Sequence, residues 1–77
     1  MNKEELLEII IDKLESNAMK RGLAFDEGVS ISCKLVGSNE KKLFEDNIDF
    51  FEERIELYTG CEVSWEIEYE EVYIAVQ

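Results

Sequence analysis

The chain has 77 residues, of which 45% are hydrophobic, and its 19 acidic and 8 basic side chains give a formal net charge of −11. This length suits one small domain with a modest core. High net charge favours disorder only when the hydrophobic fraction is low, so we expect a folded chain. No apolar run is long enough to cross a membrane and the acidic start does not resemble a signal peptide, so we expect a cytoplasmic protein.

A helix is predicted over residues 3–21. Asn2 fits the N-cap position, and Glu4 and Glu5 follow in the first turn, where the helix dipole favours acidic side chains. An apolar face recurs at helical spacing and consists of Leu6, Leu7, Ile10, Leu14 and Ala18. Gly22 then fits the position just beyond the helix end.

A strand is predicted over residues 29–36, after a turn at residues 26–28. Small or basic residues alternate with its apolar residues, which are Val29, Ile31, Cys33 and Leu35. The chain has two cysteines, Cys33 and Cys61. Without a secretory signal we expect both to be reduced and buried as small hydrophobic side chains.

A second helix, predicted over residues 39–58, has two apolar stripes. The first is expected to face the core and consists of Phe44, Ile48, Phe51, Ile55 and Tyr58. The second lies about 100° around the helix and consists of Leu43, Phe50 and Leu57. Both stripes belong to the core if the helix is wedged between the sheet and the first helix. Alternatively, the second stripe contacts a partner or a second copy, with Phe50 as its anchor.

Two more strands, over residues 61–68 and 71–76, are expected to form a hairpin. Glutamates occupy most alternate positions of the first strand, and its apolar residues are Cys61, Val63, Trp65 and Ile67. The second strand has its apolar residues at Val72, Ile74 and Val76. A turn at residues 70–71 and a four-residue loop over residues 68–71 both keep these residues on one face. We favour the loop, because consecutive glutamates are poor in turns that need a positive φ.

These elements predict a single α+β domain over residues 1–77, a two-layer fold of order α-β-α-β-β. The segment from residue 29 to residue 68 is expected to form a right-handed crossover with two parallel strands, and the last strand adds antiparallel to the second. The result is a three-stranded mixed sheet with two helices on one face. The other face is expected to meet solvent and carries Ser30, Ser32, Lys34, Glu66, Glu68 and Tyr73.

The residue types argue against catalysis and metal binding. The chain has no histidine, so it lacks a histidine-based triad or metal site, and neither cysteine has a histidine to activate it. Residues 46–49 lack the spacing of a calcium loop, and Gly37 is not part of a glycine-rich phosphate loop. We therefore predict no enzyme activity, no catalytic residue, no metal and no cofactor.

The negative charge is concentrated in the second half of the chain. Residues 43–77 contain eleven acidic side chains and one base, Arg54, whereas residues 1–42 are nearly neutral. Our candidate partner-binding residues are Glu45, Asp49, Glu52, Glu53, Glu56, Glu62, Glu66, Glu68 and Glu70. Rows of carboxylates at helix and strand spacings can imitate a nucleic-acid backbone and occupy a Lys- and Arg-rich groove. The alternative is a solvated face that supports solubility or adaptation to high salt, although solubility alone does not explain the absence of lysine from residues 43–77.

At the level of class alone, the chain resembles the small acidic inhibitors that phages and mobile elements encode against host nucleic-acid enzymes, such as anti-CRISPR, anti-restriction and uracil-glycosylase-inhibitor proteins. The resemblance lies in size, compactness, the missing histidine and proline and the uneven acidity, and in no motif. It implies stoichiometric inhibition by occlusion of a DNA- or RNA-binding surface, in the host cytoplasm if a phage encodes the chain.

The leading hypothesis is therefore a small acidic binding protein that blocks a basic, nucleic-acid-binding protein or complex, without binding nucleic acid or membrane itself. The alternative is a homodimeric structural or accessory domain that associates through Leu43, Phe50 and Leu57. A third interpretation is a small-ligand binder with a pocket at an oligomer interface, which the few cationic side chains make poorly suited to nucleotides.

Overall fold

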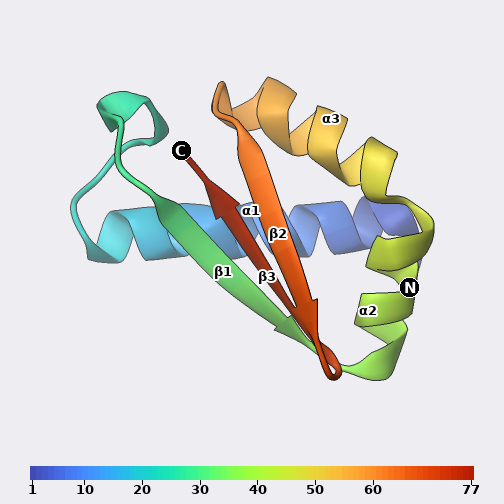
Figure 1. The fold of residues 1–77 in the computed structure, drawn as a ribbon. Helices are drawn as coiled ribbons and strands as arrows, with labels where there is room; N and C mark the ends of the chain where they lie inside the picture. Colours follow the sequence, from blue (N-terminus) through green and yellow to red (C-terminus); the bar gives the residue numbers. More distant parts are fainter.

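The protein has an α+β fold (Figure 1). A computed structural model describes the backbone of residues 1–77 and the side chains of all of them except Asp26. In chain order the elements are α1 (Lys3–Lys20), the short 3-10 helix η1 (Phe25–Glu27), β1 (Ile31–Val36), α2 (Ser38–Asp46), α3 (Ile48–Thr59), β2 (Val63–Glu68) and β3 (Glu71–Val76).

Local hydrogen bonds define both ends of α1. The Asn2 side chain accepts a hydrogen bond from the Glu5 N–H at 2.9 Å, and the Asn2 N–H donates to the Glu5 carboxylate at 3.2 Å, which completes a capping box. After the helix, Gly22 takes a φ of 65° and the Leu23 N–H donates to the Ala18 carbonyl. The buried face between these ends is Leu6, Ile10, Leu14 and Ala18. Neither α1 nor any other helix of the described residues is both long and apolar enough to cross a membrane.

The sheet has the order β1-β3-β2, and both pairings are antiparallel. The predicted mixed sheet is therefore wrong. β1 and β2 run in the same direction, as the crossover requires, but β3 lies between them (Figure 1). The last strand of the described chain is thus the central one.

The composition of β3 explains its central place. A central strand is enclosed by a neighbour on each side, whereas an edge strand lets charged side chains reach water. β3 has a single charged residue, Glu71, at its start, and it buries Val72, Ile74 and Val76. β2 carries the two carboxylates of Glu66 and Glu68. Because β2 is an edge strand, these carboxylates have a neighbouring strand on one side only and can reach water. The apolar β3 therefore suits the central position better than β2 does.

A tight turn at residues 69–70 joins β2 to β3. Trp65 pairs with Ile74, which is the register that the predicted loop over residues 68–71 gives. The loop is shorter than expected, because its first and last residues also pair with each other. Tyr69 supplies a positive φ of 55°, the conformation that tight hairpin turns require.

One face of the sheet packs with the helices into the core, and the other is open. Figure 1 shows α1 crossing behind the sheet. The largest fully buried side chains come from the helices and from β1 and β3 and are Phe44, Phe51, Leu6, Ile10, Leu14, Ile31, Ile55, Ile74, Val72 and Val76. Exposed residues of the open face are Ser32, Lys34, Val36, Ser64, Glu66, Glu68 and Tyr73.

The helix predicted over residues 39–58 is in fact two helices, because the helical backbone conformation is interrupted at Asn47. Asn47 has φ −135° and ψ 34°, and its N–H donates to the Phe44 carbonyl instead of continuing the helical pattern. Its side chain donates to the Leu43 carbonyl at 2.9 Å and so satisfies a group that the helix end leaves free. The break accompanies the stacking of Phe44 on Phe51, whose ring centroids are 5.3 Å apart. Phe44 and Phe51 are seven positions apart, and on a straight helix that separation corresponds to about 10.5 Å along the axis. The interruption at Asn47 therefore accompanies a closer approach of the two rings.

The core stripe of this region also ends differently from the prediction. Tyr58 is 54% exposed, and Thr59 is buried instead. Phe51, Ile55 and Thr59 recur every four residues, so α3 turns Thr59 to the core. The Thr59 hydroxyl is satisfied there, because it donates to the Ile55 carbonyl at 2.8 Å.

Candidate functional site

Four carboxylates project from the solvent side of α3. Together with Leu57 they line one shallow hollow of about 410 Å³, and they are Asp49, Glu52, Glu53 and Glu56. They gather on this side because Phe51 and Ile55 turn the opposite side of α3 to the core. We call these four residues the α3 acidic cluster.

A second set of carboxylates lies along β2. Glu66 and Glu68 alternate with core-side residues and face the open side of the sheet. Glu62 continues the row, because its backbone exchanges hydrogen bonds with Gln77 at 3.0 and 3.1 Å and extends the ladder by one pair. Glu70 lies outside the row, in the turn. We call Glu62, Glu66 and Glu68 the β2 acidic row.

Trp65 connects the two sets of carboxylates. Its indole N–H donates to the Glu52 carboxylate at 3.2 Å, and the edge of its ring packs on Phe44 with 5.9 Å between centroids. Trp65 is 36% exposed and lies on the core side of β2, whereas Glu66 lies on the open side of the same strand. The α3 acidic cluster and the β2 acidic row therefore lie on the two sides of a single edge strand.

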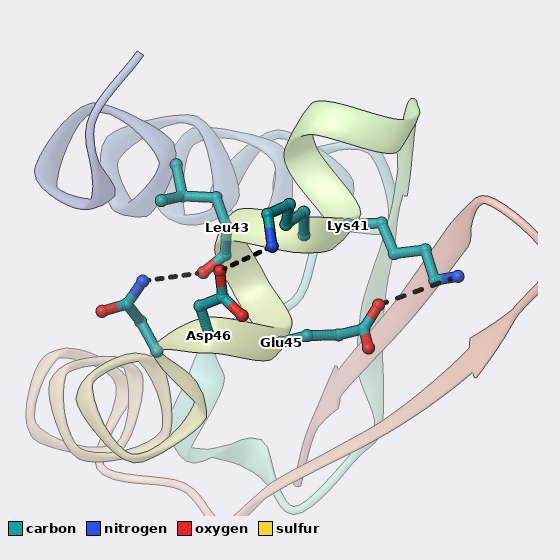
Figure 2. A network of polar contacts seen from close by, with 6 residues as sticks. Lys41, Leu43, Glu45 and Asp46 are labelled. Carbon is teal, nitrogen blue, oxygen red and sulfur yellow. Dashed lines mark hydrogen bonds and ion pairs between the residues drawn. The ribbon is translucent and has the colours of Figure 1, made fainter.

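Glu45 does not lie in the same row as the carboxylates of α3, although the sequence predicts that one helix carries them all. The break at Asn47 leaves Glu45 on α2, where its carboxylate lies 3.7 Å from the Lys41 ammonium. Figure 2 shows Lys41 and Glu45 extending from the same side of α2, and both line a hollow near the β2–β3 turn that also includes Glu70. Asp46 is likewise paired, with Lys42 at 3.4 Å. Two of the three acidic side chains of α2, Glu45 and Asp46, thus each have a lysine partner.

The α3 acidic cluster and the β2 acidic row have no such partners. Among the side chains that the structure describes, three ion pairs form, and their acidic members are Glu45, Asp46 and Glu71. Arg54, the one base of this half, places its guanidinium carbon 5.0 Å from the centre of the Phe50 ring. Eight of the eleven carboxylates in residues 43–77 therefore have no cationic partner at ion-pair distance among the described side chains.

The second apolar stripe does not form one surface. Leu43 and Phe50 are half-buried and pack against the core, whereas Leu57 is 74% exposed. Two cations cover the Phe50 ring, with the Lys3 ammonium 4.6 Å from its centre and the Arg54 guanidinium on it as well. Two cations of the same chain thus lie over the ring that the homodimer hypothesis takes as its anchor.

The open face has a polar contact on β3 that the sequence does not reveal. The Tyr73 hydroxyl donates to the Glu71 carboxylate at 2.6 Å, and the Lys34 ammonium lies 3.4 Å from the same oxygen. The hydrogen bond from Tyr73, with a smaller contribution from Lys34, lowers the pKa of the Glu71 carboxyl. The same hydrogen bond to the Glu71 carboxylate raises the pKa of the Tyr73 hydroxyl. Alternation places Lys34 and Tyr73 on one face, but only the strand order makes them neighbours.

The open face is hollowed where small residues stand side by side. Ser32 pairs with Ala75, and Ala75 with Ser64, across the three strands. They lie in a hollow of about 620 Å³ that also includes Lys34 and Glu66. Because its charges have both signs, this hollow does not share the negative character of the α3 acidic cluster.

The chemistry of the remaining polar groups is limited. No three histidine, cysteine or carboxylate side chains within the described part of the chain are grouped so that they could hold a metal ion. Both cysteines are free thiols. Cys33 lies in the core, and the half-buried Cys61 donates to the Phe25 carbonyl at 2.9 Å.

Comparison of the chain with protein-family models, with curated proteins and with solved structures gives no match.

Proposed function

We propose that the chain is a non-enzymatic binding protein that blocks a basic, nucleic-acid-binding surface of another protein. One observation supports this proposal above the others. The α3 acidic cluster and the β2 acidic row flank one edge strand and have no cationic partners among the described side chains. A basic surface that approaches β2 would therefore meet negative charge on both sides of the strand.

The spacing of the carboxylates suits an extended basic surface better than a single cation. Neighbours on one face of a strand are about 6.6–6.8 Å apart, and one turn of helix separates neighbours on α3 by about 5.4 Å. Ligands of a bound metal ion converge on one point, which these side chains do not. A groove that binds nucleic acid supplies a distributed positive field of the matching kind. An acidic protein seated in that groove excludes the nucleic acid, as in the inhibitor class that the chain resembles.

Two variants of equal net charge can test the proposal. The site variant replaces Glu53, Glu56, Glu66 and Glu68 by glutamine, in the cluster and the row. The control variant makes the exposed substitutions Glu4→Gln, Glu8→Gln, Asp12→Asn and Glu27→Gln. Each variant loses the same charge, so a difference between them reports position rather than net charge.

The measurement is the displacement of DNA or RNA from a panel of purified nucleic-acid-binding enzymes, at low and high salt. We expect the chain to displace nucleic acid from at least one of these enzymes, and to do so more weakly as salt screens the charges. The site variant should lose roughly tenfold or more in apparent affinity, while the control variant keeps it. A partner that binds the site variant as tightly as the original chain would contradict the proposal.

A further inference from the structure

The outer edge of β2 consists of unpaired backbone groups. Bonded and non-bonded pairs alternate in an antiparallel ladder, and Glu62 with Gln77 is a bonded pair. Residues 64, 66 and 68 therefore also bond to β3. The N–H and C=O groups of Val63, Trp65 and Ile67 point the other way, toward the outside of the sheet.

The outer edge of β1 is different, because α1 closes part of it. The Asn17 side chain donates to the Ser32 carbonyl at 2.6 Å, and the Arg21 guanidinium donates to the Ser30 carbonyl at 2.7 Å. β1 also buries each of its core-side residues. By contrast, no residue of β2 is buried, and no described residue forms a hydrogen bond with its outward backbone groups. The side chains of α1 thus cover the start of the β1 edge, whereas none covers the outer edge of β2.

The side chains beside the outer edge of β2 indicate what could pair with it. On the open face they are the carboxylates of Glu66 and Glu68, and on the core side they are the partly exposed Val63, Trp65 and Ile67. An added strand would direct its side chains alternately to these two rows. The opposing Cβ atoms would then lie about 4.5–5.5 Å apart. A segment in which basic and apolar residues alternate therefore fits both rows.

We propose that the outer edge of β2 accepts such an extended basic and apolar segment of a partner protein as a fourth strand. Main-chain hydrogen bonds supply the attachment in this mode, and the alternate side chains supply its specificity. The inference rests on the proposed function for the sign of the partner's charge and adds the manner of binding. The bond between Trp65 and Glu52 places the α3 acidic cluster beside the same edge, where it attracts the same basic segment.

A second copy of the chain is a poorer occupant of this edge. Two β2 strands paired side by side would bring together two copies of Glu66 and Glu68, and each chain carries a net charge of −11. Like charges on neighbouring strands oppose pairing. The same carboxylates that attract a basic strand therefore keep this edge from self-association.

Residue-resolved amide hydrogen exchange can test the proposal with a synthetic peptide in which lysine and valine alternate. We expect the peptide to slow exchange at Val63, Trp65 and Ile67 by about tenfold or more, since each outward N–H gains an acceptor. The outward amides of Lys34 and Val36 on β1 are the internal control and should keep their rates. Absence of slowing at the β2 amides would overturn the proposal.

Two further measurements separate strand addition from simple charge attraction. A peptide of the same sequence with every backbone nitrogen methylated keeps its charge but has no N–H to donate, and we expect it to give no protection. Val63→Pro removes an outward N–H without removing a bond to β3, so it should weaken binding of the unmethylated peptide. If this variant does not fold, the methylated peptide still distinguishes strand addition from charge attraction. Equal binding of both peptides would overturn strand addition and leave the proposed function standing. The proposed function is tested separately, by the displacement of nucleic acid and by the loss of affinity in the site variant.

Discussion

The thiol of Cys33 provides a test of the core at the scale of a single residue. Cys33 is 7% exposed in β1, and burial raises the pKa of its thiol from 9.0 to about 11, against a smaller opposing effect of Lys13. The unfolded chain therefore releases this proton at a lower pH than the folded chain does. The resulting stabilisation is fully present below pH 9 and is lost as the pH rises toward 11, by about 2–3 kcal/mol in total.

Denaturant unfolding of the original chain and of Cys33→Ala between pH 8 and about 11 measures this contribution. Other groups titrate in the same range, so the relevant quantity is the difference in slope between the two proteins. We expect the free energy of unfolding to fall more steeply with pH in the original chain. Parallel slopes would show that the Cys33 thiol is not shielded from water.

At the scale of an element, Asn47 decides where α2 ends and α3 begins. Its side chain bonds to the Leu43 carbonyl, and its replacement by alanine leaves that half-buried carbonyl unsatisfied. We expect Asn47→Ala to lower the free energy of unfolding by about 1 kcal/mol in chemical denaturation. Asn39→Ala is the matched control, since Asn39 is exposed in the first turn of α2, and it should change stability little. Equal effects of the two substitutions would mean that the break does not depend on the Asn47 side chain.

The elements show what sequence periodicity can and cannot predict. Alternation identifies the faces of β2 and β3, because a side chain's face depends only on its position along its own strand. It does not identify neighbours, which is why the central position of β3 and the antiparallel sheet were missed. The break at Asn47 was missed for a related reason. Phe44, Ile48, Phe51 and Ile55 keep a helical spacing across it.

The candidate site was predictable to a similar extent. The exposure of carboxylates such as Glu53 and Glu66 follows from their position opposite the apolar residues. The separation of Glu45 from the α3 acidic cluster depends on the break in the helix, so no pattern could predict it. The cations over Phe50 come from Lys3, 47 positions earlier, and from Arg54. Such a contact between distant residues leaves no local signature in the sequence.

At the scale of the whole molecule, the uncompensated charge opposes folding. Compaction brings like charges together in a chain of net charge −11, and salt screens this repulsion. We expect the site variant, with four neutralised glutamates, to be more stable than the original chain at low salt by roughly 0.5–1 kcal/mol. The difference should shrink as sodium chloride is added. Thermal unfolding of both proteins over a salt series provides the measurement, and a less stable site variant at low salt would show that these carboxylates favour the fold.

The central position of β3 has a consequence for the order in which the protein can form. Each residue of β1 pairs with one that lies 35 to 45 positions later in the chain, and β2 pairs only with β3. During synthesis, neither strand therefore has a partner until residues 71–76 have left the ribosome. The helices can form earlier, because their bonds are local. The sheet, and with it the edge that we propose as a docking site, appears in one late step that depends on contacts of high sequence separation.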